Sequence, residues 1–256
     1  MKNCGLIGRN IRYSRSPEIH NKYYKDNDIQ FNYKIFNIDN EKELEYFMQN
    51  VKNNNIIGFN VTIPYKEKIL QYLDEIIYPA SIIGAVNTIL VDDKKFIGYN
   101  TDYYGFIDSL KEHQIQNIDK KHILILGNGG SAKAVYTALI DLGVKYIDVA
   151  GRNLKNIEQD FLYAKNILNI KSKIDLHQYD MLINCTPLGN TNNNILPMEL
   201  ENYKEDLVIY DLNYSPPKSK LLCLGESKGL KVVNGEAMLI AQAIHSIDIW
   251  KSKVKE

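Results

Sequence analysis

The sequence predicts an α/β protein of two domains. Three features lead to this prediction. Short apolar strands end in polar residues, the middle of the chain has a strand that passes through a glycine turn into a helix, and a long apolar helix ends the chain. A strand that passes through glycines into a helix starts a parallel α/β domain, so the residues before it form another domain. We therefore expect the chain to divide into two domains near this turn.

The composition is that of an ordinary globular protein. Of the 256 residues, 45% are hydrophobic and 24% are charged, and the formal net charge is zero. A neutral chain gives no reason to expect a nucleic acid or an anionic membrane as partner. No apolar run approaches the roughly 20 residues that span a bilayer, and no signal-peptide pattern is present. We expect a cytoplasmic protein.

Cysteine and histidine usage argues against a disulfide framework and a metal site. Cys4, Cys185 and Cys223 are odd in number, widely spaced and set in apolar segments, which fits reduced, buried thiols. None of the five histidines lies at zinc-ligand spacing from a cysteine or another histidine.

The first strand, residues 4–8, leads into a polar loop that contains Ser14 and Ser16. Pro17 then opens a helix, with Ser16 as its expected N-cap. Two hydroxyls near a helix start can hold a carboxylate together. The alternative is that Ser16 only caps the helix and Ser14 only forms a turn.

Residues 31–38 alternate like a strand, and residues 41–50 have the apolar spacing of a helix. In the next strand, residues 56–63, Asn60 and Thr62 share one face and Phe59, Val61 and Ile63 the other. Pro64 fits the first turn of a helix. Lys66 then follows the strand's carboxyl end, where α/β sheets bind ligands. The alternative is a solvated lysine beside an incidental Asn and Thr.

Asn87 and Asp102 are the next polar candidates. Gly84 ends a short helix, and Asn87 follows among apolar strand residues, where an unbonded buried amide costs about 1–3 kcal/mol. Asn87 must therefore bond to protein or to a ligand. Residues 92–95 form a hairpin turn. Asp102 lies at the start of the helix that follows the returning strand. The alternative to a functional role for Asp102 is that it only caps this helix.

The central segment predicts a dinucleotide site. Residues 122–126 form a buried strand that stops at Gly127, and a helix follows with Gly143 as its C-cap. Such a turn aims bare N–H groups and a helix N-terminus at a phosphate, which side chains at Gly127, Gly129 or Gly130 would block. The pattern is G-x-G-G and not the full dinucleotide motif, so a purely structural turn is the alternative.

Arg152 indicates which dinucleotide is bound. It follows the strand at residues 146–150, where an NAD site has an acidic residue, whereas a cation suits the 2′-phosphate of NADP. A mere surface charge is the alternative. We expect a helix over residues 153–168 and strands over residues 180–186, 207–212 and 231–233. The last helix carries one amide that can point inward, Gln242.

Together these motifs resemble the shikimate dehydrogenase family from Gly5 to Trp250. The resemblance rests on Ser14-x-Ser-Pro-x-x-His-Asn21, Asn60-Val-Thr-Ile-Pro-x-Lys66, Gly84-Ala-Val-Asn-Thr88, Asn100-Thr-Asp102, Gly127-x-Gly-Gly130, Ile183-Asn-Cys-Thr-Pro-x-Gly189, Asp211-x-x-Tyr214 and Gly235-x-x-Met-Leu-x-x-Gln242. Departures from the usual family pattern are Gly151 and Asn153 around Arg152, Lys155, Tyr103 and Asn190.

The resemblance implies an N-terminal α/β substrate-binding domain of residues 1–101 with 236–256, a Rossmann-like NADP-binding domain of residues 102–235, and a last helix that packs back on the first domain. It implies NADPH-dependent reduction of 3-dehydroshikimate to shikimate, in aromatic amino acid biosynthesis. Lys66 and Asp102 would act as the catalytic pair on the C3 oxygen. The substrate would be held by Ser14, Ser16, Asn60, Thr62, Asn87, Tyr214 and Gln242. The cofactor would be held by Gly127, Asn128, Gly129, Gly130, Ser131, Arg152, Asn153, Lys155, Thr186, Pro187, Leu212 and Gly235.

Two other functions compete with this one. The first is a quinate or dual quinate/shikimate dehydrogenase that uses NAD, against which Ser14, Ser16 and Arg152 argue. The second is a nucleotide-sensing protein without turnover, against which the presence of both Lys66 and Asp102 argues. The family contains monomers and dimers, so either state is expected.

Overall fold

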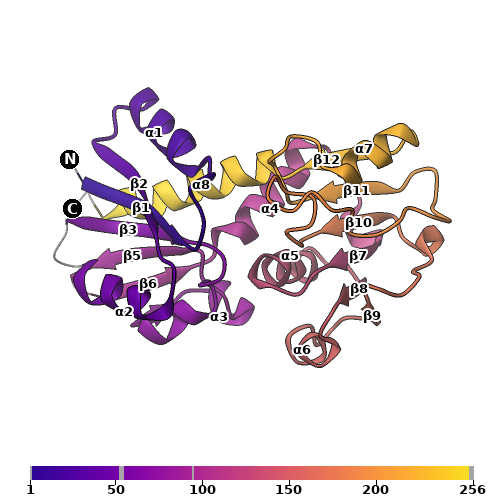
Figure 1. Ribbon diagram of the computed structural model, residues 1–256, viewed down its shortest axis with the longest axis horizontal. Coiled ribbons are helices and arrows are strands. Elements are labelled where there is room, and N and C mark those ends of the chain that lie inside the picture. Colours follow the sequence, from indigo (N-terminus) through magenta and orange to yellow (C-terminus); the bar gives the residue numbers. More distant parts are fainter. Residues whose placement is uncertain (1, 52–54, 94, 254–256) are drawn as a thin grey trace. The chain divides into compact units, whose positions relative to one another are not determined.

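The computed structural model describes residues 2–51, 55–93 and 95–253, which divide into two compact units (Figure 1). The first unit spans Met1–Gly105 and Ile240–Glu256, and the second spans Phe106–Leu239. The divisions fall inside helices α4 (Thr101–Glu112) and α8 (Glu236–Ser252), a few residues beyond the boundaries suggested by the sequence. Among the described residues, no helix is long and apolar enough to cross a membrane.

A mixed six-stranded sheet organises the first unit, in the order β2-β1-β3-β5-β6-β4. Its strands are β1 (Lys2–Gly8), β2 (Phe31–Asn37), β3 (Ile56–Val61), β4 (Glu75–Ile76), β5 (Thr88–Asp92) and β6 (Lys95–Tyr99). Its helices are α1 (Ser16–Asp26), α2 (Glu41–Asn50), the 3₁₀ helix η2 (Lys68–Tyr72) and α3 (Ala80–Ile83). β1 runs parallel to β2 and β3, and β5 runs antiparallel to β3 and β6. The predicted β5–β6 hairpin is present, although its turn residue Lys94 lies outside the described residues.

Helix α8 supplies part of the first unit's core. Ile247 and Trp250 are fully buried and pack in one cluster with Cys4, Tyr33 and other residues of this unit. The Trp250 indole N–H donates a hydrogen bond to the Ile89 carbonyl at 3.0 Å. This confirms the prediction that the last helix packs on the first domain.

The second unit has a six-stranded parallel sheet in the order β12-β11-β10-β7-β8-β9. Its strands are β7 (His122–Leu126), β8 (Tyr146–Gly151), β9 (Ile167–Asn169), β10 (Met181–Asn184), β11 (Val208–Asp211) and β12 (Lys231–Asn234). Its helices are α5 (Gly130–Asp141), α6 (Leu154–Asp160), α7 (Lys220–Ser227) and the 3₁₀ turns η3 (Ile118–Lys120) and η4 (Leu176–Gln178). The strand order reverses between β7 and β10, which makes the carboxyl ends of these strands the expected ligand site of a Rossmann-like fold.

The predicted helix over residues 153–168 is wrong beyond Asp160. Phe161 turns inward, is 1% exposed and packs edge-on against the Tyr136 ring. The chain then pairs with the sheet, as Lys165 N donates to Ile147 O at 2.8 Å and β9 forms. Burial of one aromatic ring and sheet pairing therefore override the helical pattern.

Two smaller expectations also fail. Pro64 lies in a turn and not in a helix, since the next helical residues are Lys68–Tyr72, and Ile63 is 62% exposed because β3 already ends at Val61. All three cysteines are free, but only Cys4 is buried. Cys185 is half-buried and Cys223 lies on the exposed side of α7.

Candidate active site

Lys66 and Asp102 form an ion pair in the first unit, with side chains 12% and 10% exposed. Lys66 follows β3, and its carbonyl accepts a hydrogen bond from Val86 N at 2.8 Å, which holds this turn beside residue 87. Asp102 lies in the first turn of α4. Asn100 caps that helix by accepting from Tyr103 N at 3.4 Å, so Asp102 is not needed as the cap. The ammonium and the carboxylate thus meet in a site almost closed to water.

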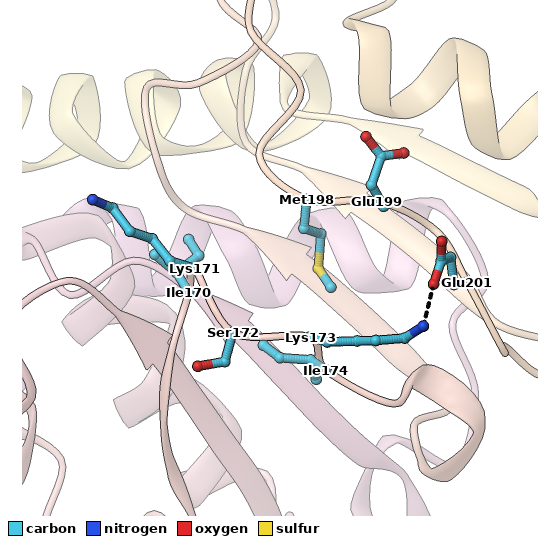
Figure 2. A pocket seen from close by; sticks show the side chains of 8 residues that line it. All are labelled: Ile170, Lys171, Ser172, Lys173, Ile174, Met198, Glu199 and Glu201. Carbon is cyan, nitrogen blue, oxygen red and sulfur yellow. Dashed lines mark ion pairs between the residues drawn. The ribbon is translucent and has the colours of Figure 1, made fainter.

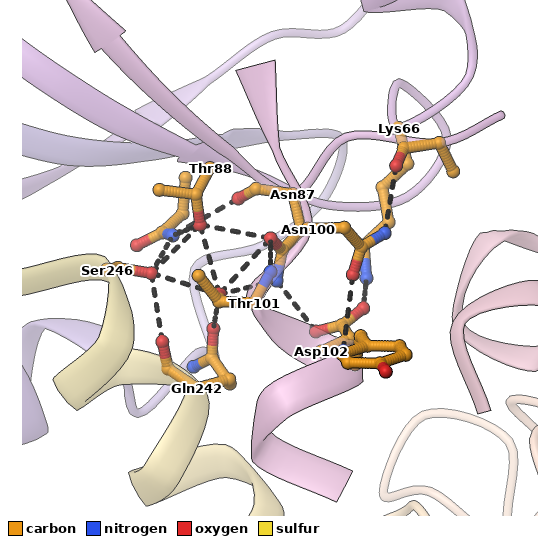
Figure 3. Close-up of polar contacts among 11 residues, drawn as sticks. Lys66, Asn87, Thr88, Asn100, Thr101, Asp102, Gln242 and Ser246 are labelled. Carbon is orange, nitrogen blue, oxygen red and sulfur yellow. Dashed lines mark hydrogen bonds and ion pairs between the residues drawn. The ribbon is translucent and has the colours of Figure 1, made fainter. Parts of the chain in front are cut away.

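Asn87 connects this pair to the rest of the unit (Figure 3). The Thr101 backbone N–H donates to Asn87 Oδ1 at 2.7 Å, which orients the amide because a backbone N–H can only donate. Asn87 Nδ2 therefore faces Asp102 and donates to its Oδ1 at 2.8 Å, while Asp102 Oδ2 pairs with Lys66. The expected partners of the buried Asn87 amide are thus protein groups.

Asn60 is 5% exposed and bonded on both sides of its amide. Its Oδ1 accepts from the Tyr33 hydroxyl at 2.7 Å, and its Nδ2 lies 3.1 Å from Asn87 O and 2.9 Å from Thr88 Oγ1. Gln242, on α8, lies beside α4, with its Oε1 3.4 Å from Thr101 Oγ1. The structure therefore brings Asn60, Asn87, Asp102 and Gln242 into one network.

Ser14 and Ser16 contact each other at the start of α1. Ser14 Oγ donates to Ser16 Oγ at 3.1 Å and accepts from Ser16 N at 3.2 Å. The predicted N-cap role of Ser16 is wrong by one residue, because Arg15 occupies the cap position without a capping side-chain bond and Ser16 is the first helical residue.

Thr62 lies just after β3, and its methyl is 2.5 Å from where a Cβ on Gly8 would be.

Sequence reasoning missed the hydroxyls of Thr88, Thr101 and Ser246. All three are fully buried and lie within 3.1 Å of one another. The rule that singled out Asn87, that a buried polar group needs a partner, applies equally to these side chains.

The glycine turn of the second unit is shaped by its neighbours. Gly127 has φ +103°, and a Cβ there would lie 3.1 Å from Thr186 Cγ2, so the ends of β7 and β10 approach closely. A Cβ on Gly129 would meet nothing within 4 Å. Gly130 and Ser131 begin α5. The turn thus leaves open space at a helix start, which fits a phosphate group.

The next strand end carries the predicted cations. Arg152 and Lys155 are exposed after β8, and Asn153 caps α6 by accepting from Asn156 N at 3.4 Å. Asn128 reaches across from the glycine turn, and its Oδ1 is 3.5 Å from where a Cβ on Gly151 would lie. These polar groups share the carboxyl edge of the sheet with the glycine turn.

A buried carboxylate holds the loop after β10. Asn184 Oδ1 accepts from both Thr186 N at 3.0 Å and Thr186 Oγ1 at 2.6 Å, and Asn184 Nδ2 donates to Asp211 Oδ1 at 3.0 Å. Burial raises the pKa of the Asp211 carboxyl, while hydrogen bonds from Ser219, Asn213 and Asn184 oppose that rise. Thr186 and the following Pro187 are therefore fixed from inside the sheet.

Leu212 and Gly235 follow β11 and β12. A Cβ on Gly235 would lie 2.0 Å from Leu212 O, so this contact requires glycine. Tyr214 belongs to the second unit, whereas the other predicted substrate residues belong to the first.

A hollow of about 420 Å³ lies elsewhere in the second unit (Figure 2). Its lining is Ile170–Ile174, Met198, Glu199 and Glu201, and Lys173 pairs with Glu201 at 2.8 Å. None of the predicted site residues lines it.

Comparisons with known proteins agree on one family. A family profile described as the shikimate dehydrogenase substrate binding domain matches residues 6–89. A shikimate dehydrogenase (NADP(+)) of Clostridium botulinum is 51% identical over 251 residues, which cover 98% of this chain and 96% of that protein. The solved shikimate dehydrogenase 1 of Peptoclostridium difficile is 33% identical, with a TM-score of 0.83 over 98% of this chain and 92% of that one. A shikimate 5-dehydrogenase of Thermus thermophilus, solved with NADP(H) and shikimate, is 28% identical, with a TM-score of 0.88 over 98% and 94%.

Proposed function

Because the chain belongs to the shikimate dehydrogenase family, we propose that it catalyses the reversible NADPH-dependent reduction of 3-dehydroshikimate to shikimate, a step in making aromatic amino acids. The observation that carries the proposal is the Lys66–Asp102 ion pair, which is almost closed to water and is oriented by Asn87. Such a pair is what a ketone reductase needs at the oxygen that changes its protonation.

The acid–base chemistry follows from the charge that develops on the substrate. NADPH, when bound, supplies the hydride. The C3 oxygen then gains alkoxide character and needs a proton or a positive charge beside it. The Lys66 ammonium is the principal acid in the reduction, and the neutral Lys66 amine is the base in the oxidation direction. Asp102 is its partner, because one carboxylate oxygen holds Lys66 while Asn87 fixes the other.

Polar groups of the first unit hold the substrate. Ser14 and Ser16 bind its carboxylate, and this role is supported by their mutual contact at the start of α1. Asn60, Thr62, Asn87 and Gln242 bind the ring hydroxyls. The family pattern also assigns Tyr214 to the substrate. Asn60 is 5% exposed, and Tyr33 and Thr88 already bond its amide.

The second unit's residues fit NADP. The open space at Gly129 and the positive φ of Gly127 suit the pyrophosphate, with Asn128, Gly130 and Ser131 completing the turn. The exposed Arg152, with Asn153 and Lys155 nearby, takes the 2′-phosphate. Thr186, Pro187 and Leu212 would complete the cofactor site, and Gly235 would lie by the nicotinamide.

A steady-state assay with shikimate and NADP tests the function through the absorbance of NADPH. Wild-type protein should reduce NADP with shikimate far faster than with quinate, and prefer NADP to NAD. Faster turnover of quinate with NAD would identify the competing dehydrogenase. Binding of NADP with no NADPH formed would identify a nucleotide sensor.

The setting of the proposed enzyme is the cytoplasm, as a monomer or a homodimer. The three free thiols support a reducing compartment. Size-exclusion chromatography with light scattering distinguishes the two assembly states.

A further inference from the structure

The buried apolar residues of α8 in the first unit share one face. Ala243, Ile247 and Trp250, spaced i, i+4 and i+7, are fully buried, whereas Ile240 is 40% exposed and Ile249 is partly buried. Burial of such a stripe fixes the rotation of a helix about its axis. Apolar contacts are non-directional, so directional contacts are needed to fix the register of α8 along that axis.

Ser246 makes such contacts with three other elements (Figure 3). Its Oγ lies 2.9 Å from Asn60 Nδ2 on β3, 2.9 Å from Thr88 Oγ1 on β5 and 3.1 Å from Thr101 Oγ1 on α4. Its only hydroxyl hydrogen is engaged by the Gln242 carbonyl of its own helix, at 2.9 Å. The oxygen of Ser246 therefore acts as an acceptor toward the sheet and α4.

Trp250 adds a second directional contact one helical turn further on. Its indole N–H donates to Ile89 O at 3.0 Å. The ring is seated against Gly58, where a Cβ would lie 2.1 Å from the indole nitrogen. A helix shifted along its axis would lose both contacts together.

We infer that Ser246, supported by Trp250, is a positioning residue that sets the register of α8 and so places the amide of Gln242 in the substrate site. Gln242 precedes Ser246 by one helical turn, so the two side chains share a face of α8. With Ser246 seated, Gln242 lies 3.4 Å from Thr101, the neighbour of Asp102. The inference rests on the proposed function, in which Gln242 contacts a ring hydroxyl of the substrate.

A double-mutant cycle tests whether Ser246 acts through Gln242. The variants are Ser246→Ala, Gln242→Ala and both together, compared by kcat/KM for shikimate at saturating NADP. We expect Ser246→Ala to lower kcat/KM about tenfold in the wild-type background and Gln242→Ala to lower it at least as much. In the Gln242→Ala background, Ser246→Ala should cost less than about twofold. Factors that multiply, or a silent Ser246→Ala, overturn the inference.

Ser109→Ala is the matched control. Ser109 is also a fully buried helical serine, which donates to Phe106 O at 2.7 Å and contacts the Tyr210 hydroxyl, but it lies in the second unit. It should lose stability as Ser246→Ala does while keeping kcat/KM, and an equal loss of kcat/KM would mean that any buried-serine change has this effect.

Two further outcomes are distinguishable. Should Ser246→Ala not fold, Trp250→Phe removes the indole N–H together with part of the ring and enters the same cycle with Gln242→Ala, where multiplying factors again overturn the inference. Wild-type protein inactive on shikimate would refute the proposed function first, and the role of Gln242 with it.

Discussion

The ammonium of Lys66 and the carboxylate of Asp102 meet although 36 positions separate them in the chain. Three contacts bring them together: Val86 N to Lys66 O, Thr101 N to Asn87 Oδ1, and Asn87 Nδ2 to Asp102 Oδ1. The pair is therefore positioned by protein contacts around β3, β5 and α4.

Replacing Lys66 should slow the chemical step. Lys66→Ala removes the proton donor to the C3 oxygen, so kcat should fall roughly 10²–10⁴-fold with a small change in KM. Lys68→Ala is the control, because that lysine is exposed and pairs with the surface residue Glu41. Steady-state kinetics of both variants are the measurement, and an unchanged kcat in Lys66→Ala would refute the assigned role.

Replacing Arg152 should change cofactor preference. Arg152→Ser removes a charge-assisted hydrogen bond to the 2′-phosphate, so KM for NADP should rise roughly ten- to a hundredfold. KM for NAD should stay the same, because NAD lacks that phosphate. Lys155→Ser, a nearby exposed lysine, should have a smaller effect. Equal rises for NADP and NAD would mean that Arg152 supports the fold and not the phosphate.

His20 should make the protein less stable in acid. Burial lowers the pKa of His20 to about 3, its ring stacks on Tyr33 at 3.9 Å, and its Nε2 has no hydrogen-bond partner among the described residues. The unfolded chain takes up a proton near pH 6.5 and the folded chain does not, so this contribution to stability is lost as pH falls from about 6.5 toward 3.

His20→Phe keeps a stacking ring and removes that proton. As the pH falls from 6 to 4, the free energy of unfolding of the variant should rise relative to that of wild type by about 1 kcal/mol per pH unit. Urea denaturation measures this difference. The exposed His177, replaced in the same way, should follow wild type. Parallel pH dependences of His20→Phe and wild type would contradict the assignment.

Gly58 should tolerate no side chain. In Gly58→Ala the new Cβ would lie 2.1 Å from the Trp250 indole nitrogen and 2.6 Å from Ile89 O, so α8 must shift. We expect a loss of about 1–3 kcal/mol in the free energy of unfolding. Gly129→Ala, where a Cβ meets nothing within 4 Å, controls for the loss of glycine itself. Equal stability of the two variants would show that the ring can move aside at no cost.

The sequence was sufficient for the two-domain fold because its signals are local. The structure confirms the strand predicted from the apolar run before the glycines, which is β7. It also confirms the helix predicted from the apolar spacing of residues 41–50, which is α2. Lys66 and Asp102 could be proposed as partners through the family resemblance, and Asn87 could be recognised from the cost of a buried amide.

Other features depend on contacts that sequence spacing does not reveal. Residues 161–169 leave the helical pattern because Phe161 finds a pocket against Tyr136, a tertiary contact. The roles of Thr88, Thr101 and Ser246 arise only when three distant segments converge. A capping position shifted by one residue, as at Ser16, depends on which of two neighbouring serines turns toward the backbone.

Because α4 leaves the first unit and α8 returns to it, the second unit is an uninterrupted stretch inserted into the first. During synthesis, residues 106–239 are therefore complete while the first unit still lacks α8, with Ile247 and Trp250 missing from its core. The first unit begins before the second in the chain and is consequently finished after it. Until then it exposes an apolar surface that a chaperone could recognise.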